Sequence, residues 1–242
     1  MNLPFQTQVR NLLLRTTSPD AYAAIAPHMR FVELPLKLTL VEPDEPTEVI
    51  YFLETGLASV VAITTEDEMV EVGHIGFEGA AGLHTALHTD RSPTKTFMQG
   101  EGGGYMVPAS VIKSTLDTRP EFRELVLRYL HSLTIQVSYT ALANARFSIY
   151  ERLSRWLLMC QDRLGDDLGL THQFLSVMLG VRRSGITDQL HLLEGIGAIR
   201  STRGNIQILN RAKLEDIAGG SYGVAEEEYH RLIGLPLRYV RS

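Results

Sequence analysis

Hydrophobic and polar positions follow two different periods along the chain. From about Met29 to Pro108, short runs such as VIYFLETGLASVVAI and EMVEVGHIG are rich in β-branched and aromatic residues and are separated by glycines and charged turns. Runs that recur about every 8–12 residues are typical of antiparallel sandwiches or rolls. The GEGGG stretch at 100–104 is too rich in glycine for a regular strand interior, so we expect a turn or a bulge there.

The next segment has the period of a helix. Residues 117–146 contain no glycine and one early proline, and apolar residues recur at intervals of three and four. One side of this long helix carries Phe122 and Tyr129, and a second side carries Leu127 and Leu130. Two apolar sides need two partner surfaces. The helix therefore packs on its own domain and on a second copy of the chain, or it lies buried between two domains.

Two shorter helices are also expected. One covers residues 4–15, with Phe5, Val9 and Leu12 on one side, and the other covers Tyr150 to Leu164 before a GDD sequence ends it.

The stretch from residue 171 to 209 predicts a helix-turn-helix followed by a hairpin. Thr171 is a good N-cap for the first helix, and Gly180 supplies the permissive backbone of a tight turn. The second helix begins around 182–184. Its buried side is predicted to consist of Ile186, Leu190 and Leu193.

The opposite side of this second helix carries groups that can read DNA. A helix of this kind inserts its N-terminal half into the major groove, where arginine can bind guanine and aspartate can accept from cytosine. Serine and threonine can contact bases or phosphates. The DNA-contacting residues predicted for the two helices are Thr171, Arg182, Arg183, Ser184, Thr187 and Asp188.

A wing is predicted after the second helix. Two short strands, Ala198–Ser201 and Ile206–Leu209, flank Gly204-Asn205, a pair that suits a tight hairpin. Arg200 and Arg203 would reach the sugar–phosphate backbone beside the groove.

Two other classes of function compete with DNA binding. Paired arginines are often only a solvated surface, so the helix-turn-helix could instead bind protein in a signalling module. A cupin-like metal-dependent enzyme could share the roll, but its only candidate ligands are His74, Glu78, His84 and His88, whose spacing matches no metal-ligand motif. We expect no catalytic residue and no metal.

Composition limits the class of protein and the compartment in which we expect it. The chain has 242 residues, 44% of them apolar and 21% charged, which is an ordinary globular balance. Residues 148–212 contain 8 Lys+Arg against 6 Asp+Glu, whereas residues 1–147 contain 11 against 17. A single cysteine, Cys160, excludes disulfides and iron–sulfur clusters, and we expect it to be a buried thiol. Without a long apolar run or a signal-peptide pattern, we expect a cytoplasmic protein that does not enter a membrane.

These features together resemble the Crp/Fnr family of transcription regulators. VIYFLETGLASVV followed by VEVGHIGFEGAAG is similar to the family's β-roll, residues 117–146 to its dimerisation helix, and residues 171–209 to its winged helix-turn-helix. The resemblance implies an α+β fold: a cyclic-nucleotide-binding-like jelly roll as sensor domain over 1–116, a dimerisation helix over 117–146, and a DNA-binding domain with a C-terminal tail over 147–242.

The same resemblance implies partners and roles. The protein would be a homodimer that binds a two-fold-symmetric site on double-stranded DNA, with RNA polymerase as a further partner. Arg183, Ser184 and Asp188 fall where the family contacts bases, with Arg182 and Thr187 beside them.

A cyclic nucleotide is a less favoured expectation. Family members that bind one use a glycine–glutamate cassette and an Arg-Ser pair that holds the cyclic phosphate. Glu78, Arg91 and Ser92 are the candidates here, but the order of the cassette differs and Pro93 removes an amide donor from the loop. We therefore expect no cofactor and place Arg91 in an exposed turn.

Overall fold

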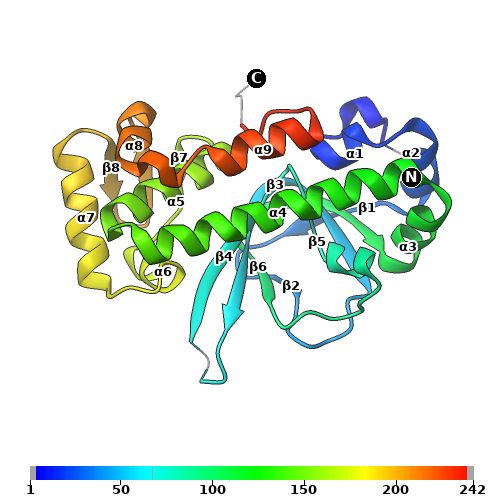
Figure 1. The fold of residues 1–242 in the computed structure, drawn as a ribbon, viewed down its shortest axis with the longest axis horizontal. Coiled ribbons are helices and arrows are strands. Elements are labelled where there is room, and N and C mark those ends of the chain that lie inside the picture. Colours follow the sequence, from blue (N-terminus) through cyan, green and yellow to red (C-terminus); the bar gives the residue numbers. More distant parts are fainter. Residues whose placement is uncertain (1–3, 67, 239–242) are drawn as a thin grey trace.

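The computed structural model describes residues 4–66 and 68–238, and its first half is a roll of antiparallel strands beside a long helix (Figure 1). The sheet has the strand order β1-β6-β3-β4, while β2 pairs with β6 and β5 pairs with β3. The strands of the roll are β1 Arg30–Leu34, β2 Thr39–Val41, β3 Val49–Ile63, β4 Met69–Ile75, β5 Ala80–Ala81 and β6 Lys95–Pro108. The predicted antiparallel roll is confirmed.

The glycines at 100–104 lie inside β6 and not in a turn. The register between β3 and β6 shifts repeatedly from Leu53 to Ala58, so the expected bulge is present. A Cβ atom at Gly102 would lie 2.2 Å from the carbonyl oxygen of Thr55. Glycine is therefore needed because the two backbones approach too closely for a side chain, and the alternative of a turn was wrong.

The N-terminal segment does not form the single helix expected over 4–15. A short 3₁₀ turn is followed by a break and then by α1, Leu12–Thr16. The side chain of Asn11 caps α1, and its amide donates to the carbonyl oxygens of Leu53 and Gly79 at 2.9 and 2.7 Å. These bonds to the roll hold Asn11 in a non-helical conformation, which is why the helical pattern is interrupted.

Helices cover the roll on one side. α4 is the predicted long helix, and it runs past the roll to the second half of the molecule (Figure 1). It buries Phe122 and Tyr129 in the core, whereas Leu127 and Leu142 remain 44% and 43% exposed. The helices of this part are α2 Pro19–Ile25, α3 Ala109–Thr118 and α4 Pro120–Arg146, and α5 Ile149–Leu164 follows them as the first helix of the second half. Within the described residues, no helix is both long and apolar enough to cross a membrane.

The second half contains a helix-turn-helix and a small three-stranded sheet of order β7-β9-β8. Ser148 begins α5 through a capping box with Glu151, immediately after α4 ends. Cys160 on α5 is fully buried, and burial raises the pKa of its thiol, which agrees with the expected inert thiol. The remaining elements are β7 Asp167–Leu168, α6 His172–Met178, α7 Arg183–Gly195, β8 Ile199–Thr202, β9 Asn205–Ile208, α8 Arg211–Ala218 and α9 Val224–Ile233.

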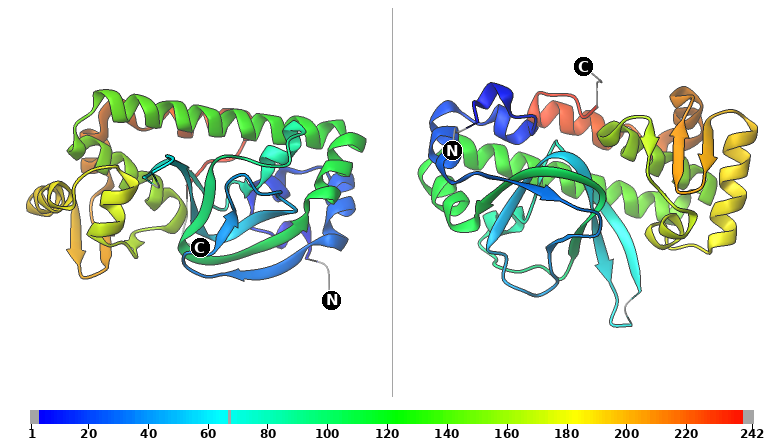
Figure 2. Two further views of the ribbon diagram at one scale, coloured as in Figure 1. Left: turned by 90° about the horizontal axis from the view of Figure 1, so that it is seen from below. Right: turned by 180° about the vertical axis from the view of Figure 1, so that it is seen from behind.

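The C-terminal tail, which includes α9, returns to the roll. α9 lies along α4 and leads the chain back toward α1 (Figures 1 and 2). Tyr229, Ile233 and Leu237 are buried in the same apolar cluster as Val9 and Leu12 of the N-terminal segment. Residues 229–237 therefore complete the apolar core beside the roll.

Candidate DNA-binding surface

α6 and α7 pack as the sequence predicted. Ile186, Leu190 and Leu193 on α7 are each 0% exposed and belong to the core of the second half. The chain reverses between the helices at Gly180, whose φ of +62° lies in the left-handed region that favours glycine. The core side of α7 is thus fixed, and its opposite side faces outward.

The first turn of α7 presents the predicted base-reading groups. Arg182 is the N-cap residue in an extended conformation, and Arg183 and Ser184 follow it as the first helical residues. All three are exposed, as is Asp188 one turn later. The helix therefore begins with two arginines and a hydroxyl that are free of the protein core.

The two threonines of the predicted set are already hydrogen-bonded within the protein. Thr171 caps α6, and its Oγ1 accepts from the Phe174 N–H at 3.1 Å. Thr187 is half-buried, and its Oγ1 donates to the carbonyl oxygen of Arg183 at 3.1 Å and lies 3.0 Å from His172 Nδ1. Because these bonds occupy the hydroxyl, the methyl group of Thr187 is more available than the hydroxyl for contact with a base.

The wing forms beside α7. β8 and β9 pair with Thr202 opposite Asn205, so Arg203 and Gly204, and not the predicted pair Gly204-Asn205, make the two-residue turn. Each strand is shifted by one residue from the predicted bounds. Arg200 and Arg203 are exposed, and the Gly204 φ of +79° explains the need for glycine at the tip. The wing therefore carries two cations near α7, the second helix of the helix-turn-helix, which we call the recognition helix.

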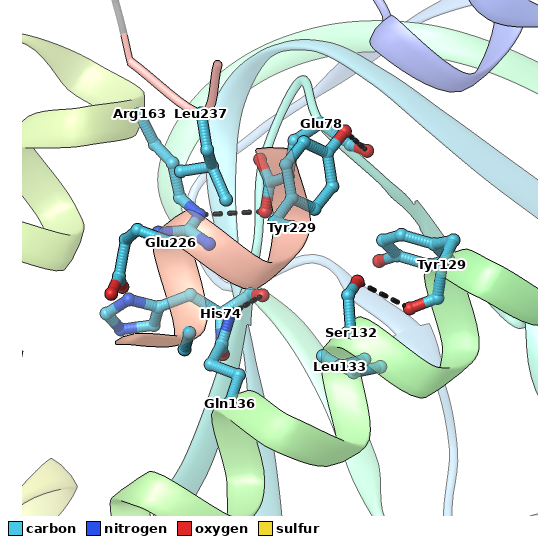
Figure 3. Close-up of a pocket in the computed structure, with 11 residues that line it drawn as sticks. His74, Glu78, Tyr129, Ser132, Leu133, Gln136, Arg163, Glu226, Tyr229 and Leu237 are labelled. Atoms are coloured by element: carbon cyan, nitrogen blue, oxygen red, sulfur yellow. Dashed lines mark hydrogen bonds and ion pairs between the residues drawn. The ribbon is translucent and has the colours of Figure 1, made fainter. Parts of the chain in front are cut away.

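The three candidate effector residues lie in two different environments. Glu78 is buried beyond the end of β4, where its Oε1 is 2.8 Å from Nε of Arg163 on α5 (Figure 3). Arg91 is 55% exposed in its side chain and lies 3.4 Å from Asp90, which matches the expected exposed turn. Ser92 shares a hydrogen bond with a neighbouring threonine of the same loop.

The surroundings of Glu78 form a polar junction between the two halves. Arg163 is 0% exposed in its side chain, and its Nη1 donates to the carbonyl oxygen of Met159. The hydroxyl of Tyr229 on α9 donates to the backbone oxygen of Glu78 at 2.8 Å. The adjoining cavity measures only about 10 Å³, which is room for one water at most and far too little for a nucleotide.

A second buried carboxylate joins the roll to α5. Trp156 Nε1 donates to Glu71 Oε1 at 2.5 Å, and Ser59 Oγ donates to Glu71 Oε2 at 2.5 Å. His74 Nε2 lies 2.6 Å from Glu71 Oε1. Glu71 and Glu78 of the roll thus bind side chains of α5, the first helix of the second half, directly.

The candidate ligands of a metal enzyme do not assemble. In the part of the chain that the structure describes, no three His, Cys, Asp or Glu side chains form a group that could hold a metal ion. His74 instead pairs with Glu71, and Glu78 pairs with Arg163.

Sequence reasoning missed the residues that connect these elements. His172 bonds to side chains 15 and 29 positions later, and Arg163 bonds to a side chain 85 positions earlier. His172 begins α6 and Arg163 lies in the last turn of α5, and neither position carries a local signal for a distant partner.

Comparison with known proteins agrees with this geometry. Residues 151–217 match the family of Crp-like helix-turn-helix domains. By sequence, no curated protein matches the chain. Many solved structures share its fold.

Three of these structures show the extent of the likeness. FixK2 from Bradyrhizobium japonicum has a TM-score of 0.69 at 15% identity, over 79% of this chain and 98% of its own. A CRP-family transcriptional regulator from Thermus thermophilus gives 0.64 at 18% identity, over 78% of this chain and 97% of its own. The c-di-GMP-responsive global regulator CLP of Xanthomonas campestris has a TM-score of 0.65 at 14% identity, over 79% of this chain and 99% of its own.

A β-roll, a long helix and a winged helix-turn-helix in this order are the architecture that these structures share with the chain. More particularly, residues 151–217 belong to the Crp-like helix-turn-helix domains, and the chain has the fold of solved structures of the Crp/Fnr family. The resemblance drawn from the sequence is confirmed.

Proposed function

We propose that the protein is a homodimeric, sequence-specific DNA-binding regulator that reads two half-sites of a two-fold-symmetric duplex. The observation that carries this proposal is the start of α7, where Arg182, Arg183 and Ser184 are exposed while the rest of the helix is anchored by a fully buried apolar side. A rigid helix with exposed arginines at its N-terminal end fits the major groove, and Arg203 on the wing can meet the adjacent backbone.

Dimerisation is supported by the outer side of α4. This helix of 27 residues keeps Leu127 and Leu142 more than 40% exposed, although its other side is buried against the roll. A second copy packed along this side would cover both leucines and would place two recognition helices on one face of the duplex, about 34 Å apart.

We further propose that the roll binds no cyclic nucleotide. Its interior is filled by apolar side chains, which include Leu53, Ile75 and Met98, each at most 3% exposed. Glu78 is held by Arg163, so it is not available to a ligand in the way that the family's cassette requires.

Selection of binding sites from a random duplex library tests the proposal. Purified protein at a fixed salt concentration should enrich a two-fold-symmetric site equally with and without cyclic AMP. Enrichment only with the nucleotide would overturn the statement about the roll. Failure to enrich any sequence, together with an absence of salt-dependent duplex affinity, would instead favour a helix-turn-helix that binds protein.

Replacement of single arginines separates reading from positioning. We expect Arg183→Ala to weaken the selected site by about 1–3 kcal/mol and to relax the preference at one base pair, because a bidentate contact to guanine is lost. Arg203→Ala should weaken all duplexes to a similar degree and lower the slope of log affinity against log salt by about 1, because a phosphate contact is lost. Titrations of matched and mismatched duplexes at several salt concentrations measure both effects. If Arg183→Ala leaves affinity and preference unchanged, the assigned reading role is wrong.

A further inference from the structure

His172 connects the three elements of the candidate DNA-binding surface. It is the first residue of α6, and its half-buried imidazole lies between the recognition helix and the wing. Nδ1 is 3.0 Å from Thr187 Oγ1 on α7, and Nε2 is 3.3 Å from Ser201 Oγ on β8. The side chain of His172 therefore links α6 to both the recognition helix α7 and the wing.

The hydrogen bonds define the roles of the two ring nitrogens. Thr187 Oγ1 donates its proton to the carbonyl oxygen of Arg183, so toward His172 it acts as an acceptor. In the neutral tautomer that fits this bond, Nδ1 carries the proton, and Nε2 accepts from the hydroxyl of Ser201. This arrangement holds Thr187 in one rotamer beneath the base-reading side of α7.

The wing end of this bridge lies close to the wing tip. Ser201 is separated by one residue from Arg203. β8 is an edge strand, because the order of the small sheet is β7-β9-β8, and its own ladder bonds to the sheet come from one side only. The Ser201 N–H donates to Glu194 Oε1 on α7 at 2.7 Å, so backbone and side chain of the same residue are both tied to the helix-turn-helix.

We propose that His172 is a positioning residue for DNA recognition: it sets the wing against the recognition helix, so that Arg203 can reach the backbone while Arg183 reads bases. The inference rests on the proposed function. His172 acts through Thr187 and Ser201 and is not itself assigned a contact with DNA.

A double-mutant cycle between His172 and Arg203 tests this role. In the otherwise unchanged protein, Arg203→Ala should lower affinity for the selected duplex roughly tenfold, as expected for loss of a charge-assisted hydrogen bond. In a His172→Ala background, the same change should lower affinity no more than about twofold, because the wing no longer holds Arg203 in place. Equal losses in both backgrounds would overturn the proposal.

Two conservative substitutions of His172 test its bonds to Ser201 and to Thr187 separately. Glutamine places its amide near the position of Nε2, and asparagine places its amide near that of Nδ1. His172→Gln should therefore keep the bond to Ser201 and preserve the cost of Arg203→Ala, whereas His172→Asn should keep only the bond to Thr187 and reduce that cost. His230→Ala, which removes an exposed imidazole on α9, should leave the cost unchanged.

A readout without DNA distinguishes failure of this inference from failure of the proposed function. Hydrogen exchange of the β8–β9 amides in the free protein should be faster in His172→Ala and His172→Asn than in the unchanged protein, and close to normal in His172→Gln. If the unchanged protein selects no duplex but this order of exchange rates holds, the proposed function fails and the positioning of the wing stands. If exchange is the same in all variants, the positioning role fails whatever the DNA result.

Discussion

Replacing Arg163 with methionine should lower the free energy of unfolding by about 3–5 kcal/mol, because it leaves a buried carboxylate without its partner. The side chains of Arg163 and Glu78 are 0% and 2% exposed, and their Nε–Oε1 distance is 2.8 Å. After the substitution, the Glu78 carboxylate would retain the bond from the Gly76 N–H, at 3.0 Å, whereas the bond from Tyr229 goes to the backbone oxygen of Glu78. Urea titration of purified protein measures the change.

Two further variants serve as controls: one also changes Glu78, the partner of Arg163, and the other changes Arg231 of the surface pair Arg231–Glu228. The double variant Arg163→Met with Glu78→Gln should lose less stability than the sum of the single variants, because neither change then strands a full charge. Arg231→Met, which removes an exposed arginine paired with Glu228, should have little effect. Arg163→Met and Arg231→Met variants of equal stability would show that the buried pair does not hold the two halves together.

Truncation of Tyr229 to alanine should cost about 3–5 kcal/mol, which is the usual loss for a large aromatic side chain removed from a core. Tyr229 is 3% exposed and belongs to the same buried apolar cluster as Phe77 and Tyr129. Burial raises the pKa of its hydroxyl well above the usual range, so the group stays protonated and donates to the backbone oxygen of Glu78. Thermal or urea unfolding of the purified variant should show this loss of stability relative to the unchanged protein.

Two matched variants separate packing from hydrogen bonding. Tyr229→Phe keeps the ring and should cost only about 1 kcal/mol for the lost hydrogen bond. Val224→Ala changes a residue that is 42% exposed on the same helix and should change stability by about 0.5 kcal/mol or less. A Tyr229→Ala variant as stable as Val224→Ala would show that α9 is not part of the sensor core.

Local patterns explain most of the correct predictions about the fold. Ile186, Leu190 and Leu193 are spaced so that any α-helix places them on one side, and this side is the buried one. Gly180 and Gly204 occupy positions with positive φ, which their residue type alone suggests. Predictions failed where distant residues intervened, as at Asn11, whose bonds to the roll interrupt the expected N-terminal helix.

The candidate site divides in the same way. Arg182, Arg183 and Ser184 are consecutive residues at the start of one helix, so their shared exposure follows from local structure. Thr187 was predicted as a contact from its place on the same side, but its hydroxyl proves to be engaged by His172 from another helix. Bonds of this kind depend on how two helices cross, and no spacing along the chain encodes them.

By itself, the sequence determined the elements that repeat at short range: the strands of the roll, the long helix, and the helix-turn-helix with its exposed arginines. These follow from periodicity and turn chemistry, which act over a few residues. Only the tertiary structure decided that Glu78 binds Arg163, that His172 bridges helix and wing, and that the tail returns to the roll. Those bonds join residues from 15 to 151 positions apart, and they form because burying apolar surface brings the elements together and leaves each buried polar group in need of a partner.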